Sequence, residues 1–200
     1  MNLPDRKADF RKQARLGRRV LHKNNGHTAA LGVVAHGISG IADLWGGAPP
    51  GTVAGYLAVG SELDAIPLMN ALAAGGWTLA LPVVMEPDVP LVFRRWCQGD
   101  SMTEGSFGIL QPSDDAPEVR PDIVLAPLLA VDDDGYRLGQ GGGFYDRTLA
   151  KWHAERHAIA VLGLGFAGQR VDAVPRDEFD QRLSGMITED GWRIYGDEKK

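Results

Sequence analysis

A glycine-rich run at residues 137–147 holds the residue types best suited to chemistry in this chain. It reads Arg-Leu-Gly-Gln-Gly-Gly-Gly-Phe-Tyr-Asp-Arg. Four glycines in five positions remove the Cβ atoms that would keep a ligand away from the backbone. A helix is predicted to follow at once, and its first N–H groups lack internal partners and carry partial positive charge. The run is therefore typical of a loop that binds phosphate.

Two common phosphate-binding loops are excluded by the residues of this run. A Walker loop requires Gly-Lys followed by Ser or Thr, and the run contains no lysine. The dinucleotide-binding fingerprint requires its third glycine at the position of Phe144. An ordinary helix cap or flexible hairpin needs only one or two glycines, so that simpler interpretation is disfavoured.

Basic residues crowd the first segment of a chain whose net charge is −5. An acidic protein is a poor general binder of nucleic acid, whereas a local basic patch suits a small polyanion. Lys7 and Arg11 lie four residues apart, so they share one face of a predicted helix at 5–23. The basic residues of this segment are Arg6, Lys7, Arg11, Lys12, Arg15, Arg18, Arg19 and Lys23.

The remaining pattern alternates between buried strands and helices. Asn24, Asn25 and Gly26 are expected to end the first helix, and a second follows at 28–45. This alternation predicts an α/β fold: a single domain over 1–200 with a doubly wound, mostly parallel sheet of Rossmann-like three-layer type and helices on both faces. Strands are predicted at 53–59, 78–84, 91–94, 123–131 and 159–164, and further helices at 64–74 and 144–157.

Bulk features narrow the class of protein further. Cys97 is the single cysteine, so no internal disulfide is possible, which fits a reducing compartment. The N-terminus has no apolar signal region, and no stretch approaches eighteen uninterrupted apolar residues. We therefore expect a cytoplasmic protein without nucleic-acid or membrane partners, either a monomer or a weak homodimer. The long polar segment 97–122 is expected to be functional.

The glycine-rich run resembles that of the 5-formyltetrahydrofolate cyclo-ligases, also called methenyltetrahydrofolate synthetases. That family typically carries Arg-Leu-Gly-x-Gly-x-Gly-Tyr-Tyr-Asp after a strand and an Asp/Gly turn. This chain departs from the pattern at Gln140, where many relatives carry Tyr or Arg, and at Phe144, where they carry Tyr. The shorter matches, in the family's order, are Lys7-x-x-Phe10-Arg11, Ser61-Glu62-Leu63-Asp64, Leu81-Pro82, Val174-Pro175 and Ile187-Thr188-Glu189.

The resemblance implies a reaction and a set of site residues. ATP would phosphorylate the formyl oxygen of 5-formyltetrahydrofolate, and N10 would close the ring to 5,10-methenyltetrahydrofolate with release of ADP and phosphate. The implied catalytic residues are Arg11, Arg137 and Tyr145. The implied ATP contacts are Lys7, Arg11, Arg137, Leu138, Gly139, Gln140, Gly141, Gly142, Gly143, Phe144 and Tyr145. The folate contacts are Leu57, Glu62, Trp96, Gln140 and Phe144, and the Mg²⁺ ligands are Asp146 and Asp180.

Several alternatives stay open on the sequence alone. Asp177 or Glu178 could replace Asp180 as the second metal-side acid, and the segment could equally be a solvated acidic turn. Leu57 and Trp96 could simply pack in the core, which is the more common role of a lone Trp. Two rival functions remain: a non-catalytic paralogue that binds nucleotide or folate, and an enzyme of the sugar-phosphate isomerase or deaminase type.

Overall fold

The computed structural model describes residues 2–196, except the side chain of Phe107, and is organised around a seven-stranded sheet. The strand order is β11-β10-β9-β6-β1-β2-β3, and the five central strands are parallel. The edge strands β3 (Val92–Arg95) and β11 (Gly191–Ile194) are antiparallel to their neighbours. The central strands are β1 (Thr52–Ala54), β2 (Thr78–Val83), β6 (Ile123–Pro127), β9 (Ala160–Leu164) and β10 (Gly185–Thr188).

The chain builds this sheet in two directions from its centre. From β1 it proceeds to β2 and β3 on one side, then crosses to β6 and continues to β9 and β10 on the other. This reversal lies between β1 and β6, and ligands of such sheets bind beyond the carboxyl ends of the strands at that point. The predicted fold class, a doubly wound and mostly parallel α/β sheet, is confirmed.

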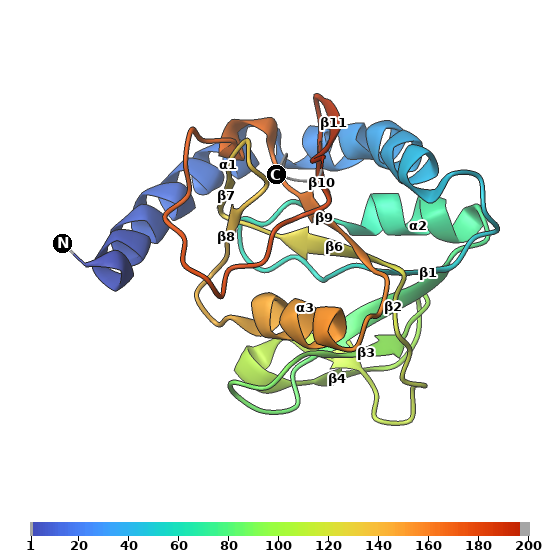
Figure 1. The fold of residues 1–200 in the computed structure, drawn as a ribbon. Coiled ribbons are helices and arrows are strands. Elements are labelled where there is room, and N and C mark those ends of the chain that lie inside the picture. Colours follow the sequence, from blue (N-terminus) through green and yellow to red (C-terminus); the bar gives the residue numbers. More distant parts are fainter. Residues whose placement is uncertain (1, 197–200) are drawn as a thin grey trace.

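Helices cover both faces of the sheet (Figure 1). The helices α1 (Leu3–Trp45) and α2 (Ile66–Ala74) lie on one face, and α3 (Phe144–Ala154) lies on the other. Successive strand residues point to opposite faces, so Ile123 belongs to the α1–α2 core and Val124 to the α3 core.

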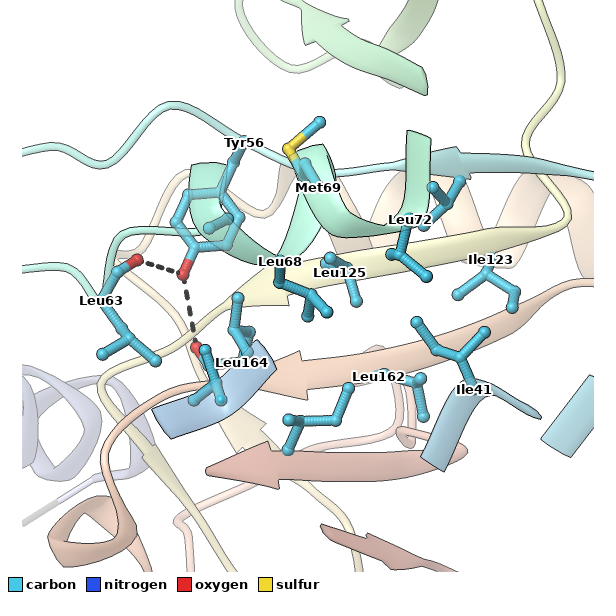
Figure 2. Packing of buried hydrophobic residues seen from close by; sticks show 14 of the residues in the cluster. Ile41, Tyr56, Leu63, Leu68, Met69, Leu72, Ile123, Leu125, Leu162 and Leu164 are labelled. Carbon is cyan, nitrogen blue, oxygen red and sulfur yellow. Dashed lines mark hydrogen bonds between the residues drawn. The ribbon is translucent and has the colours of Figure 1, made fainter. Parts of the chain in front are cut away.

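The core on the α1–α2 face is built from aliphatic side chains of both layers. Figure 2 shows Ile41 of α1 and Leu68 of α2 packed over Leu125 and Leu162 of the sheet. Complete burial of such a side chain stabilises the fold by roughly 1.5–3 kcal/mol. This core therefore fixes where α1 crosses the sheet.

One unbroken helix replaces the two predicted between residues 5 and 45, so the expected break at residues 24–26 was wrong. Glycine and asparagine have low helix propensity, at most about 1 kcal/mol per residue, and tertiary packing of a long helix outweighs it. Gly37 lets α1 pack closely against Leu68 of α2, and Gly40 lets it pack against Trp192 of β11. A break in the helix would expose these side chains. The helix begins after Asn2, whose side chain accepts from the Asp5 N–H, and ends before Gly46 at a left-handed φ of 65°.

Two predicted strands are markedly shorter in the structure, and the long polar segment contains a hairpin. The strand predicted at 53–59 is reduced to β1, which ends at Ala54. The predicted strand at 123–131 divides after Pro127, which lacks an N–H donor, into β6 and β7 (Ala130–Val131). β7 pairs with β8 (Arg137–Leu138), and β4 (Met102–Glu104) pairs with β5 (Leu110–Pro112). Two short 3₁₀ helices, η1 (Ser106–Gly108) and η2 (Ala167–Gln169), complete the elements of the described residues.

The helix α1 contains a window that is long and apolar enough to cross a membrane by composition, with a mean hydropathy of 1.2 over eighteen residues. This is weak evidence for a membrane span, because the core helix of a water-soluble protein passes the same test. In this structure Ala29, Val33 and Ile41 of α1 are buried in the core. The apolar side therefore has a packing role, and the absence of a membrane partner stays a prediction.

Two glycines of α1 make a matched pair for testing the packing of this helix. A Cβ at Gly37 would lie 2.6 Å from both terminal carbons of Leu68, so Gly37→Ala should lower the free energy of unfolding by about 1–3 kcal/mol. Exposed Gly17 has nothing within 4 Å, so Gly17→Ala should raise it by about 0.5–1 kcal/mol. Urea unfolding measures both, and changes of the same sign would contradict the packing described.

Candidate active site

A cavity of about 890 Å³ opens at the carboxyl ends of the central strands. Tyr56 and Leu57 follow β1, Pro127 and Leu128 lie at the end of β6, and Leu81 comes from β2, so the cavity sits at the point where the strand order reverses. The hairpin β4–β5 contributes further apolar lining from the long polar segment. The volume suits a small-molecule ligand of drug or cofactor size.

The glycine-rich run forms the loop between β8 and α3 and lines this cavity. Gly141 and Gly143 have φ angles of 110° and 66°, which glycine adopts at no steric cost. A Cβ at Gly141 would lie 3.4 Å from the Arg11 guanidinium, so the bare backbone also lets α1 approach. Gly143 caps α3 without a side-chain hydrogen bond, which leaves the positive end of the helix directed at the cavity.

Basic residues of α1 hold this loop from one side. Arg11 donates from Nε to the carbonyl of Gly139 at 3.1 Å. Arg15 donates to both the side-chain and the backbone oxygen of Gln140, each at 3.0 Å. Because two rigidly spaced side chains of one helix bind adjacent loop carbonyls, the position of α1 determines the position of the loop.

Lys7 joins the start of α1 to the acidic segment near the end of the chain. Its ammonium lies 2.8 Å from Asp177 and 2.6 Å from Asp180. Burial alone would lower the pKa of Lys7, but the hydrogen bonds and charges of the two carboxylates outweigh it and raise that pKa. The hydrogen bond from Lys7 in turn lowers the pKa of Asp177.

Arg137 is a buried cation in the cavity wall. Its guanidinium lies 3.2 Å from Asp146, which also accepts from the backbone N–H of Gln181 at 3.1 Å, and it stacks 5.4 Å from the ring centre of Tyr145. The buried Nε of Arg137 has no hydrogen-bond partner among the described residues. An unmade buried hydrogen bond costs about 1–3 kcal/mol, so an anionic ligand oxygen would stabilise this position.

The phenol of Tyr145 lines the cavity and is better suited to donate a hydrogen bond than to act as a base. Burial raises the pKa of its phenol, the nearby charge of Glu62 raises it further, and Arg137 only partly opposes them. The phenol therefore stays protonated at neutral pH. It can donate to an oxygen of a ligand as negative charge develops there.

Glu62 presents a fixed carboxylate in the cavity wall. One of its oxygens accepts from the backbone N–H of Val59 at 3.0 Å. The other accepts from Arg18 and from the side-chain amide of Gln140, both at 3.4 Å. A carboxylate that is held on both oxygens suits a ligand that offers N–H donors at a defined position.

One predicted folate contact lies elsewhere. Trp96 is only 5% exposed, packs in the core on the α1–α2 face, and is not among the residues that line the cavity. Trp96 directly follows β3, and its N–H donates to the carbonyl of Leu79 in β2. The structure thus gives Trp96 the core role, with its indole turned inward. The predicted residues that do line the cavity are Lys7, Arg11, Leu57, Glu62, Arg137, Leu138, Gly139, Gln140, Gly141, Gly142, Gly143, Phe144, Tyr145, Asp146 and Asp180.

Sequence reasoning missed the roles of Arg15 and Arg18. Both were listed only as members of the basic segment, with no role of their own, yet Arg15 binds Gln140 and Arg18 binds Glu62. A signal was present in the sequence, since positions 7, 11, 15 and 18 are spaced four, four and three apart and follow one face of a continuous helix. The expected break at residues 24–26 did not affect this segment, so the spacing could have been used.

The comparisons with known proteins agree with this geometry. The model of the 5-formyltetrahydrofolate cyclo-ligase family matches residues 5–189. The chain belongs to this family.

Relatives within the family share about a third of the aligned residues. The 5-formyltetrahydrofolate cyclo-ligase of Escherichia coli strain K12 is 34% identical over 142 residues, which are 68% of this chain and 77% of that protein. The enzyme of the same name from Mycolicibacterium smegmatis is 33% identical over 148 residues, covering 68% and 73%. This membership supports the cyclo-ligase prediction over an isomerase or deaminase and over a non-catalytic paralogue.

Solved structures of the family share the fold. The 5,10-methenyltetrahydrofolate synthetase of Aquifex aeolicus superposes with a TM-score of 0.74 at 26% identity, over 97% of this chain and 95% of that one. The synthetase of Mycoplasma pneumoniae has a TM-score of 0.67 at 21% identity, over 92% and 98%, and supports the fold alone.

The acidic residues of this cyclo-ligase chain fit a magnesium site of the kind that phosphates complete. Among residues 2–196 no three His, Cys, Asp or Glu side chains gather as a self-sufficient metal cluster. Mg²⁺ in phosphoryl-transfer sites usually takes only one or two carboxylates, together with phosphate oxygens and water. Asp146 accepts from the N–H of Gln181, which directly follows Asp180 in the chain, and both acids line the cavity.

Replacement of Lys7 should lower the stability of the protein more at neutral pH than in acid. Lys7→Met should lower the melting temperature at pH 7 by about 1–3 °C, as expected for a partly exposed ion pair. The contribution of Asp177 is present above its ordinary pKa of 3.8 and is lost as pH falls through its lowered folded pKa, so the difference should shrink between pH 5 and pH 3.

Thermal melts of the wild type, Lys7→Met and the exposed control Lys12→Met at several pH values measure this effect. A difference between wild type and Lys7→Met that stays constant down to pH 3 would contradict the ion pairs described here.

Proposed function

We propose that the protein converts 5-formyltetrahydrofolate to 5,10-methenyltetrahydrofolate at the expense of ATP. The observation that carries the proposal is that one cavity joins a glycine loop at a helix N-terminus to the fixed carboxylate of Glu62. The first feature suits a triphosphate and the second suits the N–H donors of a pterin ring. Family membership supports the same pairing of ligands.

The proposed reaction has two steps. The formyl oxygen attacks the γ-phosphorus of ATP, and the bond to the bridging oxygen breaks to release ADP. N10 then attacks the formyl carbon and gives up its proton, the carbon–oxygen bond breaks, and hydrogen phosphate leaves with that proton and the former formyl oxygen. Both steps depend on holding reactants in line and on stabilising oxygen charge, and neither needs a protein nucleophile.

The residues of the cavity supply those requirements. The backbone of residues 139–143 and the start of α3 would wrap the phosphates, while Lys7, Arg11 and Arg137 would neutralise their charge. Tyr145, kept protonated by its raised pKa, would donate to the oxygen that carries the developing charge. The apolar wall around Leu57 and Leu81 would exclude water from the folate rings.

Magnesium would be held by Asp146 and Asp180. The ion supplies neutralisation of charge on the transferring phosphate when it is bound. Asp180 accepts a hydrogen bond from Lys7 in this structure. When phosphates bind, Lys7 would turn towards them and Asp180 would be released for the metal. We also propose a cytoplasmic location and a monomeric or weakly dimeric state, with no nucleic-acid or membrane partner, from the charge and composition alone.

The purified protein should form the methenyl product from 5-formyltetrahydrofolate only when ATP and Mg²⁺ are both present. The near-ultraviolet absorbance of the product follows turnover, and excess EDTA should abolish it because the phosphate charge is no longer neutralised. Product formed without ATP would remove the phosphorylation step. Tight binding of both substrates without any product would favour the non-catalytic paralogue.

Bulk in the glycine loop should block the nucleotide. Gly141→Val places a branched side chain in the loop at a φ of 110° and should raise the KM for ATP at least about tenfold, because backbone contact with phosphate is lost. Gly99→Val is the matched control: its φ is 98°, nothing lies within 4 Å of its Cβ, and it does not line the cavity. Steady-state kinetics of both variants measure the effect, and equal ATP KM values would contradict the loop assignment.

A further inference from the structure

Arg18 is a buried cation that lies behind the cavity wall and does not line the cavity. It is 4% exposed, whereas the other basic residues of α1 are exposed or half-buried. Its guanidinium donates to Ser61 Oγ at 3.2 Å, to Glu62 Oε1 at 3.4 Å and to the carbonyl of Leu128 at 3.2 Å. Burial lowers the pKa of Arg18 and the charge of Glu62 opposes that shift. A buried charge of this kind persists only where a specific partner compensates it.

The partner of Arg18 is the one buried carboxylate of the described residues that also lines the cavity. Glu62 is 7% exposed, and three donors from three parts of the chain determine its orientation: Arg18, the backbone of Val59 and the amide of Gln140. The other charged or titratable groups that act on this pair are Arg15 of α1, Tyr56 after β1 and Tyr145 of α3. Arg18 is therefore the cation in direct contact with Glu62.

We propose that Arg18 is a positioning residue for folate recognition, which it serves by holding the carboxylate of Glu62 in a fixed orientation at the cavity wall. The inference rests on the proposed function, because it takes Glu62 as the group that meets the pterin. Basic residues on one face of α1 would then have two different roles. Lys7 and Arg11 line the cavity, while Arg18 supports the carboxylate of Glu62 from behind the cavity wall. If Arg18 were an ordinary surface residue, its side chain would be exposed. If the ion pair only stabilised the fold, its acid, Glu62, would not be expected to line the cavity.

The effect of removing Arg18 should appear in folate binding and not in ATP binding. In Arg18→Met the buried carboxylate of Glu62 loses the cation that orients it and should turn away from the ligand. The KM for 5-formyltetrahydrofolate should rise roughly tenfold to a hundredfold, the range seen when a group that orients a ligating side chain is lost. The KM for ATP should stay within about twofold, because the glycine loop is held by Arg11 and Arg15.

The experiment compares Arg18→Met, Arg18→Lys, Glu62→Gln and the double variant Arg18→Met with Glu62→Gln. Arg18→Lys keeps the charge and should recover part of the folate KM. In the Glu62→Gln background, Arg18→Met should add no more than about twofold, because no carboxylate remains for it to hold. Arg19→Met, an exposed neighbour on α1, controls for the loss of a positive charge from this helix.

Direct binding keeps the test independent of turnover. Calorimetric titration of each variant with 5-formyltetrahydrofolate alone gives Kd values for the folate. If the variants bind folate in the expected pattern but the protein shows no turnover, the proposed function is contradicted and the role of Arg18 is still supported. If Arg18→Met does not fold, the double variant buries no unpaired charge and is compared with Glu62→Gln. Equal losses for folate and ATP, or effects of Arg18 and Glu62 that multiply independently, would overturn the inference.

Discussion

The contact between α1 and the glycine loop is the interaction on which the rest of the site depends. A loop with four glycines in five positions has little conformational preference of its own, so something else must hold it. Arg11 and Arg15 bind the carbonyls of successive loop residues, and α1 is anchored far from the loop by packing against α2 and β10. Packing of α1 in the hydrophobic core therefore keeps the glycine loop in place.

The charges of the cavity are arranged so that ligands exchange partners and do not meet bare ions. Lys7 is paired with Asp177 and Asp180, and Arg137 is paired with Asp146. These pairs reduce the cost of holding cations in a partly dry cavity. Under the proposed function, a triphosphate with magnesium would offer each group a new partner of the correct sign, with phosphate for the cations and the metal for the acids.

Much of the fold and of the site could be predicted because the relevant signals are local. Alternating buried strands and helices predicted the doubly wound sheet, and the run of residues 137–146 predicted a phosphate loop beside a carboxylate. The errors arose where tertiary contacts outweigh local preference. Asn24, Asn25 and Gly26 weaken a helix by propensity, but packing further along α1 keeps it continuous. For Trp96 the sequence left open a folate contact or a core position, and the structure places it in the core.

The amino-acid sequence by itself determined the chemistry that is available: a side-chain-free loop, basic residues at helical spacing, and acids that follow the loop and a strand. Only the tertiary structure decided which of those groups meet. Helical spacing places Arg18, and not Arg19, on the face of Lys7, Arg11 and Arg15, but it does not say that Arg18 is buried against Glu62 while Arg19 is exposed. The reason is geometric, since the rotation of α1 on the sheet is set by apolar contacts three to six helical turns further along, at Ala29, Val33 and Ile41, and the residues around Arg18 do not encode that angle.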